Sequence, residues 1–238
     1  MVIAFTSLVI GAYILGSVPA AYLIAKWSRG IDIRQYGSGN VGASNVLAVV
    51  SKRWSVPVTV FDLVKGMIVV FVAKLIGLEA YQQVAVGIAA IAGHNWPIFL
   101  RFSGGRGALT TIGVVVALTP WLGLTLTAVA FLFSPFRQLA LGTLVAIAAL
   151  PLCSWLLSQP FCIEERHQLT FGFLIIFLIA VFRRLSAPRS PFTASLPTGE
   201  LMVNRLLFDR DIRDRKAWIS QTPSEISPTE KPSKQEES

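Results

Sequence analysis

Charged residues are scarce in this sequence. Only 14% of its 238 residues are Asp, Glu, Lys or Arg, whereas a soluble domain usually carries about a quarter. The apolar residues fall in long runs, which cover residues 1–25, 56–73, 107–133, 139–157 and 169–182. Because a membrane-spanning helix needs about 20 apolar residues, the runs exclude an ordinary soluble domain. The sequence predicts an all-α, polytopic membrane protein.

Residues that bind metals or form disulfides are scarce as well. The chain has two cysteines and two histidines, and Cys153 and Cys162 have neither metal-ligand nor redox spacing. A Walker-type phosphate loop and zinc-ligand spacing are also absent. We therefore expect no metal and no other cofactor.

The net charge of +8 does not indicate nucleic acid binding. The basic residues flank the apolar runs, where the positive-inside rule and anionic headgroups favour them. We expect membrane lipids, and not nucleic acid, among the partners. The first run, residues 1–25, lacks a basic segment before it and a cleavage site near its end. It therefore predicts a retained helix and not a secretion signal.

The basic clusters indicate the topology. They lie at residues 26–34 together with 52–53, at 101–106, at 137 and at 183–189. If all of them face the cytoplasm, an even number of crossings joins each cluster to the next. The helices predicted on this basis cover residues 56–76, 80–100, 139–157 and 169–182. The turn at 158–168 carries Glu164 and Glu165, which suits the outer side.

Residues 106–137 allow two interpretations. Pro120 lies near the middle of this stretch, where a proline removes a hydrogen-bond donor and breaks or kinks a helix. Two short helices meeting at Thr119–Pro120 keep Arg137 cytoplasmic, whereas a single span places Arg137 outside. We favour the first, which gives about seven membrane helices, with the N-terminus outside and the C-terminus cytoplasmic.

The composition divides the chain into three parts. Residues 1–185 form the predicted transmembrane domain, and residues 186–219 a cytoplasmic basic amphipathic segment. Within that segment, residues 204–219 could lie on the lipid headgroups. Residues 220–238 are polar and poor in aromatic residues, which predicts a disordered tail.

The first candidate site, which we call the first loop, is residues 32–45. It combines glycines with small hydrogen-bonding side chains, which are Gly37, Ser38, Gly39, Asn40, Gly42, Ser44 and Asn45. Glycines let backbone N–H groups turn toward an anion, and such concave arrays favour phosphate. The same residues also suit a flexible loop with turns. The pattern leaves both interpretations open.

The second candidate site, the second loop, is residues 93–107. His94 lies near the predicted cytoplasmic end of an apolar helix. Ionisable residues in a span often mark a functional site, and a neutral imidazole can act as a general base. The alternative is that His94 is a packed side chain with no role in catalysis. Gly104 and Gly105 offer backbone donors, and Arg106 offers a guanidinium group suited to phosphate.

Asp62 and Lys65 add a third feature. They are three residues apart in an apolar run, so a helix places them on one face, close enough to pair. Such a pair either neutralises the charge of an inserted helix or orients a loop. The sequence does not distinguish these two roles.

Several segments together resemble the bacterial acyl-phosphate:glycerol-3-phosphate acyltransferases, the PlsY family, in order and spacing over roughly residues 11–215. They are Gly16-Ser-Val-Pro19, Asp32-Ile-Arg34, Gly37-Ser-Gly-Asn-Val-Gly-Ala-Ser-Asn-Val46, Phe61-Asp-Leu-Val-Lys-Gly66, Ala92-Gly-His-Asn-Trp-Pro97 and Phe102-Ser-Gly-Gly-Arg-Gly107. The resemblance implies a multi-pass protein of the bacterial cell membrane with its active site at the cytoplasmic face. It also implies acyl transfer from acyl phosphate to glycerol 3-phosphate, giving lysophosphatidic acid and phosphate, in phospholipid biosynthesis.

The resemblance also implies site residues. His94 and Ser38 are the expected catalytic residues, with His94 positioning or deprotonating the acceptor hydroxyl; substrate phosphate is the alternative proton acceptor. The expected substrate-binding residues are Gly37, Gly39, Asn40, Ser44, Asn45, Lys52, Gly104, Gly105, Arg106, Arg205 and Asp211. No metal ligand is expected.

The chain departs from the family pattern at several positions. Ala48 stands where the first loop of the family has an arginine, for which Lys52 could substitute. Ser103 replaces a lysine and Met202 an asparagine, while Asp209 and Asp211 align with a glycine and a glutamate. Because of these changes, an alternative stays open: the chain could be a weakly active or inactive family member that binds phosphorylated lipid precursors. An acyl thioester donor also stays open, whereas a transporter is disfavoured because polar residues gather at one face.

Overall fold

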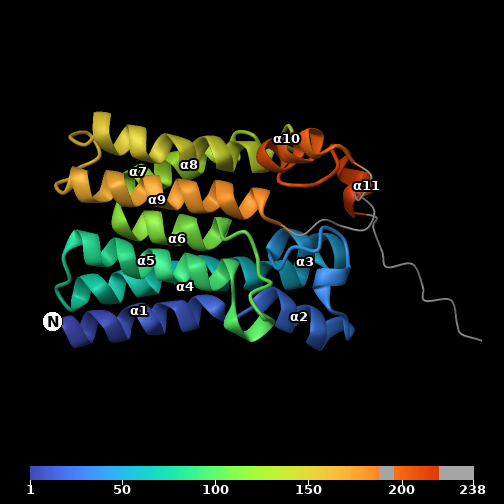
Figure 1. Cartoon of the computed structure of the whole chain (residues 1–238), viewed down its shortest axis with the longest axis horizontal. Coiled ribbons are helices and arrows are strands. Elements are labelled where there is room, and N and C mark those ends of the chain that lie inside the picture. Colours follow the sequence, from blue (N-terminus) through green and yellow to red (C-terminus); the bar gives the residue numbers. More distant parts are fainter. Residues whose placement is uncertain (188–195, 220–238) are drawn as a thin grey trace, which may run out of the picture.

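The computed structural model describes residues 1–187 and 196–219, and in these two ranges every regular element is a helix (Figure 1). The predicted all-α membrane fold is confirmed. Five longer helices and two shorter ones run along the bundle. The longer ones are α1 (Val2–Ser17), α4 (Lys52–Leu75), α5 (Ala80–Asn95), α8 (Leu139–Leu156) and α9 (Arg166–Leu185), and the shorter ones are α6 (Ala108–Leu118) and α7 (Pro120–Phe131). The tail predicted at 220–238 lies outside the described residues.

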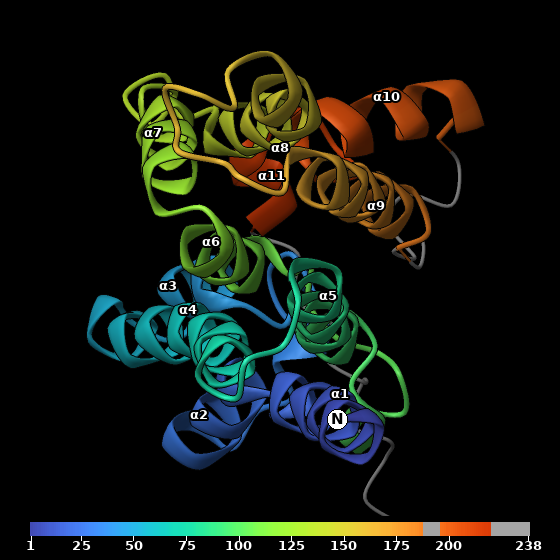
Figure 2. The same ribbon diagram turned by 90° about the vertical axis from the view of Figure 1, so that its left-hand side faces the viewer.

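The two ends of the bundle differ. The N-terminus and the connections α4–α5 and α8–α9 lie at one end, which faces the viewer in Figure 2. The opposite end, which we call the loop end, holds α2 (Ala20–Arg29), α3 (Ala43–Val49) and α10 (Thr198–Phe208) (Figure 1). Both candidate loops therefore lie at the same end of the bundle.

Helices α6 and α7 meet where the sequence predicts. Helix α6 ends at Leu118 and α7 begins at Pro120, because the first helical position needs no N–H donor and suits proline. Lys74 donates from the end of α4 to the Ala117 carbonyl, 2.6 Å away. The α6–α7 turn therefore lies at the end opposite to the loops.

Five helical segments of the described chain are long and apolar enough to cross a membrane, whereas α6 and α7 have 11 and 12 residues. At about 1.5 Å per residue, neither reaches the roughly 30 Å of a bilayer core. The number of membrane crossings therefore stays a prediction.

Cysteine labelling tests the predicted topology. With Cys153 and Cys162 replaced by serine, the Arg137→Cys variant should react with a membrane-impermeant reagent only after the cytoplasmic side is opened. A variant that keeps the exposed native Cys162, in the turn predicted outside, should react in intact cells. Labelling of position 137 from outside contradicts the prediction.

The first apolar run forms two helices and not the single helix expected. Helix α1 ends at Ser17 and α2 begins at Ala20. Pro19 cannot donate a backbone hydrogen bond, and the residue before a proline avoids the helical conformation. Val18 is accordingly extended, with φ −64° and ψ 113°. At the break, the carbonyls of Gly16 and Val18 accept hydrogen bonds from Lys65 of α4.

Glycines bring the helices of the core into close contact. A Cβ on Gly16 would overlap the Ala90 carbonyl, and one on Gly93 would overlap the Tyr13 carbonyl, so α1 and α5 pack backbone to backbone. Gly66 and Gly113 do the same for α4 and α6. Small residues at helix contacts are typical of membrane bundles.

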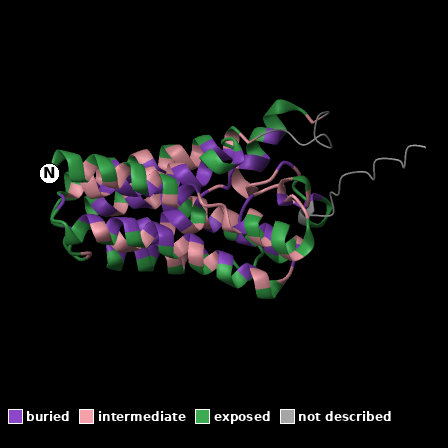
Figure 3. Ribbon diagram, turned by 90° about the horizontal axis from the view of Figure 1, so that it is seen from below, coloured by how far each residue is buried: buried purple, intermediate pink, exposed green. Residues whose placement is uncertain are grey.

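Large apolar side chains cover the outside of the bundle. Along α4 the exposed ones include Val56, Val60, Val64 and Ile68, which repeat every four residues on one face (Figure 3 shows burial along the helices). An exposed apolar stripe of this length suits contact with lipid.

The described part of residues 186–219 contains two helices, α10 and α11 (Arg215–Ile219). Helix α10 packs against α8 and α9. Arg205 is buried, and its Nε donates to Asp211 Oδ1 at 2.7 Å. This ion pair lies within the segment, whereas the bond from Arg205 Nη1 to the Leu185 carbonyl, at 2.9 Å, joins the segment to the end of α9.

Candidate active site

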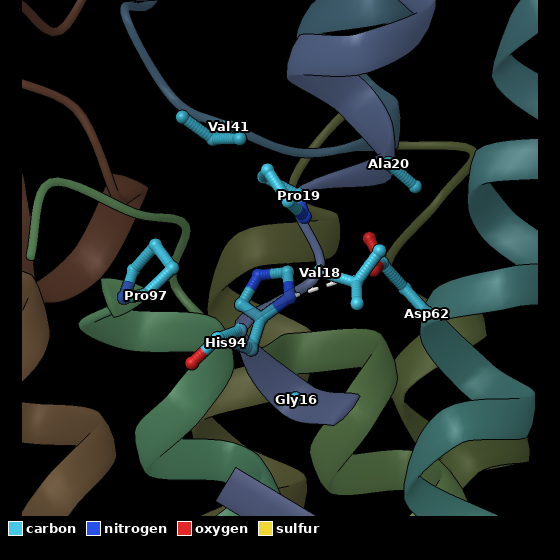
Figure 4. Close-up of a pocket in the computed structure, with 9 residues that line it drawn as sticks. Gly16, Val18, Pro19, Ala20, Val41, Asp62, His94 and Pro97 are labelled. Carbon is cyan, nitrogen blue, oxygen red and sulfur yellow. Dashed lines mark ion pairs between the residues drawn. The ribbon is translucent and has the colours of Figure 1, made fainter. Parts of the chain in front are cut away.

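The pocket at the loop end lies between the α1–α2 break, the first loop, α4 and the end of α5. Its lining includes Val18, Pro19, Val41, Asp62 and His94 (Figure 4). Backbone at the helix break and polar side chains of two neighbouring helices therefore surround one small cleft. Such a combination is typical of binding sites in membrane proteins.

Asp62 and His94, which line this pocket, are joined by a third buried polar side chain, that of Lys65. The ammonium of Lys65 lies 2.8 Å from Asp62 Oδ1 and 3.0 Å from His94 Nδ1. It also donates to the Gly16 carbonyl at 3.1 Å. Asp62 and Lys65 pair as predicted, and the structure adds that both contact His94. The helix break of α1, the α4 pair and the α5 histidine are thus one connected cluster.

The second loop closes directly over His94. Gly105 donates its backbone N–H to the His94 carbonyl at 3.1 Å. A Cβ on Gly105 would overlap His94 Nε2 and would lie 2.6 Å from the Val41 carbonyl oxygen. The two loops and the imidazole edge therefore meet at one point.

Arg183 of α9 holds the second loop from the other side. Its Nε donates to the Gly105 carbonyl and its Nη2 to the Gly104 carbonyl, both at 2.9 Å. The side chain is buried. The Gly105 N–H and both carbonyls are thus used within the protein, so these glycines act mainly by allowing close approach to His94.

The first loop is organised around Asn45. Its side-chain oxygen accepts from the Ser38 N–H at 3.1 Å, and its Nδ2 donates to the carbonyls of Ile33, Tyr36 and Asn40 at 3.2, 3.0 and 3.1 Å. Asn45 is buried. We expected it to contact a ligand, but its geometry is that of a residue that shapes the loop.

An ion pair closes the start of the first loop. Arg34 donates through Nη2 to Asp32 Oδ2 at 2.6 Å. These hydrogen bonds hold the pKa of the Asp32 carboxyl below its ordinary value, although partial burial opposes them. Asp32 is therefore a structural carboxylate and not a proton donor near neutral pH.

The other residues predicted for the site lie at different depths. Ser38, Gly39 and Asn40 are partly exposed and Gly37 is buried, while Ser44 and Lys52 are exposed. Ser44 and Ala48 are on α3, and Lys52 is the first residue of α4. Asn40 directly precedes Val41, which lines the pocket, and the Asn40 N–H donates to Ser38 Oγ at 3.4 Å.

Arg106 is already paired in the structure. Its Nη1 lies 2.8 Å from Asp209 Oδ2 and also contacts the Asp209 carbonyl oxygen. Arg184 Nε lies 3.6 Å from the other carboxylate oxygen. Asp209 ends α10 in the left-handed conformation, with φ 58°. A carboxylate from the C-terminal segment therefore neutralises two of the cations at the loop end.

Sequence reasoning missed Arg183 and Asp209 as site residues. From the sequence, Arg183 belongs only to the basic cluster at 183–189 that indicates topology, and Asp209 only aligns with a glycine of the family. Both contact residues more than seventy positions away in the chain. Arg183 donates to the Gly104 carbonyl, and Asp209 pairs with Arg106. In the described part of the chain, no group of three or more His, Cys, Asp or Glu side chains could hold a metal ion.

The chain is similar to known proteins over most of its length. A family described as "Glycerol-3-phosphate acyltransferase" matches residues 6–189. "Glycerol-3-phosphate acyltransferase 4" of Dehalococcoides mccartyi (strain CBDB1) is 44% identical over 216 residues, which are 91% of this chain and 93% of that protein. "Glycerol-3-phosphate acyltransferase 5" of another strain of this species is 44% identical over 230 residues, covering 96% and 99% of the two chains.

Solved structures agree with the sequence comparisons. The crystal structure of PlsY (YgiH), an integral membrane glycerol 3-phosphate acyltransferase, in its glycerol 3-phosphate form is 31% identical with a TM-score of 0.71, covering 89% of this chain and 96% of that one. The lysphosphatidic acid form is 30% identical with a TM-score of 0.69, covering 91% and 98%. The chain therefore belongs to the glycerol-3-phosphate acyltransferase family, the PlsY family of integral membrane acyltransferases of phospholipid synthesis.

Proposed function

We propose that this enzyme transfers an acyl group from acyl phosphate to the 1-hydroxyl of sn-glycerol 3-phosphate, at the cytoplasmic face of the bacterial cell membrane. The products are lysophosphatidic acid and inorganic phosphate. The observation that carries the proposal is the meeting of two glycine loops at His94, next to the cation Arg106, at one end of an apolar bundle. The similar structures with glycerol 3-phosphate and lysphosphatidic acid support it.

The reaction needs positioning more than a reactive side chain. The hydroxyl oxygen of glycerol 3-phosphate forms a bond to the acyl carbon, and the bond from that carbon to the phosphate oxygen breaks. The hydroxyl proton leaves with a base, and the overall product is hydrogen phosphate. Because acyl phosphate is already activated, the protein mainly has to align the two reactants and stabilise charge. Ser38, Asn40 and Arg106 are our candidates for binding the phosphate groups.

One sequence feature that is common in thioester-using enzymes is absent from this chain. Enzymes that use thioesters often carry an aspartate five residues after the histidine, and here that residue is Phe99. The exposed apolar face of α4 suits entry of an acyl chain from the lipid side.

The test uses purified protein in liposomes with palmitoyl phosphate and glycerol 3-phosphate. We expect phosphate and lysophosphatidic acid to form in equal amounts, and both to be lost in the His94→Ala variant and reduced in Ser38→Ala. Palmitoyl-CoA and palmitoyl acyl carrier protein serve as alternative donors. Turnover with a thioester alone contradicts the proposed donor.

The departures from the family pattern add a control. If folded protein shows no turnover beside an active relative, the Ala48→Arg variant tests whether the missing arginine is responsible. Ala48 is exposed on α3, so the longer side chain fits without displacing the core. Recovery of activity would show that the loss is local to position 48 on α3, next to the first loop.

Asp209 competes with substrate for Arg106 under this proposal. An ion pair of this kind contributes about 1 kcal/mol, which corresponds to roughly fivefold in affinity. The Asp209→Gly variant should therefore lower the KM for glycerol 3-phosphate by about fivefold. Glycine also suits the positive φ at this position, so the backbone should tolerate the change.

The matched control for Asp209 is Asp214→Gly, which removes a charge from the same segment at an exposed position. That variant should leave KM near the wild-type value. An unchanged or higher KM in Asp209→Gly would show that the carboxylate does not compete with the substrate. Steady-state kinetics at saturating palmitoyl phosphate measure both variants.

A further inference from the structure

Lys65 is a buried lysine whose ammonium group contacts one ring nitrogen of His94. Its ammonium meets three acceptor positions: Asp62 Oδ1 at 2.8 Å, the Gly16 carbonyl at 3.1 Å and His94 Nδ1 at 3.0 Å. The Val18 carbonyl, at 3.4 Å, is a longer fourth contact. Lys65 and Asp62 are each 2% exposed, so water does not replace these partners.

The donors and acceptors can be counted. An ammonium group has three N–H donors and accepts no hydrogen bond, while a carboxylate and a backbone carbonyl only accept. The remaining partner of Lys65, His94 Nδ1, must therefore accept as well. A neutral imidazole has one donor nitrogen and one acceptor nitrogen. With Nδ1 as the acceptor, the proton of His94 is on Nε2.

The opposite tautomer conflicts with this geometry. A proton on Nδ1 would point at the ammonium hydrogens of Lys65, and Asp62 Oδ1 lies 3.5 Å from Nδ1, which is too far for a good hydrogen bond. Removing a proton from Lys65 would relieve the conflict but would leave the Asp62 carboxylate without its counter-charge. An unpaired buried charge is costly in a protein interior.

The Nε2 edge of His94 faces the place where the two loops meet. The missing Cβ of Gly105 would overlap this nitrogen and lie beside the Val41 carbonyl. In Figure 4 the ring stands between Pro97 and Asp62, with one nitrogen toward Asp62 and the other toward the pocket. The nitrogen on the pocket side is the one that carries the proton.

We infer that Lys65 is a positioning residue that holds His94 as the Nε2–H tautomer, so that His94 presents a hydrogen-bond donor to a substrate oxygen in the pocket. The part of this inference that concerns substrate rests on the proposed function. Asp62 acts through Lys65 by supplying its counter-charge.

Nitrogen NMR tests the tautomer directly. The chain has two histidines, and the second, His167, lies in α9 against Trp155, away from the site. In protein labelled with ¹⁵N-histidine, the His167→Gln variant leaves His94 as the one signal. We expect a protonated Nε2 and an unprotonated Nδ1 at neutral pH. A protonated Nδ1 with a bare Nε2 overturns the inference.

A second measurement asks whether Lys65 is the cause. In Lys65→Met the carboxylate of Asp62 stays beside His94, and Nδ1 is expected to gain a proton. In the double variant Asp62→Leu/Lys65→Met, which removes both charges and keeps the segment neutral, the signal should become a mixture of tautomers. If the spectrum of either folded variant equals that of the parent, Lys65 does not position the proton.

Two substitutions at position 94 test the role in turnover. A glutamine places an amide N–H₂ near the position of Nε2 and is not a base, whereas an asparagine reaches only the position of Nδ1. If His94 is a donor, His94→Asn should lower kcat about 100-fold, the usual cost of losing one such donor, while His94→Gln retains most of it. If His94 is a base, both lose about 100-fold or more, which overturns the inference.

The outcomes separate this inference from the proposed function. Wild-type protein without turnover on palmitoyl phosphate and glycerol 3-phosphate contradicts the proposed function, while the NMR measurements still decide the tautomer. An active wild type with a bare Nε2 contradicts the inference alone.

Discussion

The Gly105→Ala variant is expected to lose at least about 100-fold in kcat/KM, since a displacement of about 1 Å at a reacting centre costs that much. The added Cβ would overlap His94 Nε2 and would lie 2.6 Å from the carbonyl oxygen of Val41. One of these neighbours is backbone and the other is an imidazole held by Lys65. To make room for the Cβ, the Val41 carbonyl or the His94 ring would have to move, which would separate the two loops.

Gly11→Ala is the matched control for this substitution. Gly11 lies in α1, and a Cβ there meets nothing within 4 Å in the structure. Both variants should insert into the membrane, and only Gly105→Ala should lose activity in the palmitoyl phosphate assay. Activity near the wild-type level in Gly105→Ala would show that the second loop does not need to close on His94.

The Arg183→Met variant is the second large effect that we expect. The guanidinium donates to the carbonyls of Gly104 and Gly105, both at 2.9 Å, in a buried position. Hydrogen bonds to a charged group contribute about 1.5–3 kcal/mol each, so the free energy of unfolding should fall by on the order of 3 kcal/mol. Activity should fall about 100-fold, because the second loop is then no longer held against His94.

Two further variants separate the causes of the Arg183 effect. Arg183→Lys keeps the charge but not the planar fork that reaches two carbonyls, so activity between that of the wild type and Arg183→Met is expected. Arg166→Met removes an arginine from the far end of the same helix, where it stacks over Trp155 at 4.6 Å, and should leave activity unchanged. Kinetics and thermal unfolding in detergent measure all three. Full activity in Arg183→Met would show that Arg183 does not hold the loop in the working enzyme.

Local chemistry explains what was predictable in this chain. Apolar runs identify membrane helices because lipid solvates only apolar side chains and a helix satisfies its own backbone. Pro120 indicates the start of α7 because proline lacks an N–H donor wherever it stands. The same reasoning applies to Pro19, where we expected one helix and the structure has a break. There the unbroken apolar run predicts one helix, and the proline within it breaks that helix.

The residue types of the site were predictable, but their individual roles were not. The sequence indicates that Asn45 belongs to a loop that could bind phosphate, and the structure uses its amide to tie Ser38, Ile33, Tyr36 and Asn40 together. An amide beside glycines can either bind a ligand or shape the loop that binds it. Only the positions of the surrounding carbonyls decide between these uses.

The sequence by itself determined that this protein is helical, lies in a membrane, and carries two glycine loops and the Asp62–Lys65 pair. These properties depend on composition and on residues within a few positions of one another. Only the tertiary structure decided that Lys65 contacts His94, that Arg183 holds the second loop, and that Asp209 forms an ion pair with Arg106. These contacts join distant parts of the chain. They arise because glycine-lined helix contacts bring backbones close and because a buried charge requires a partner wherever the fold supplies one.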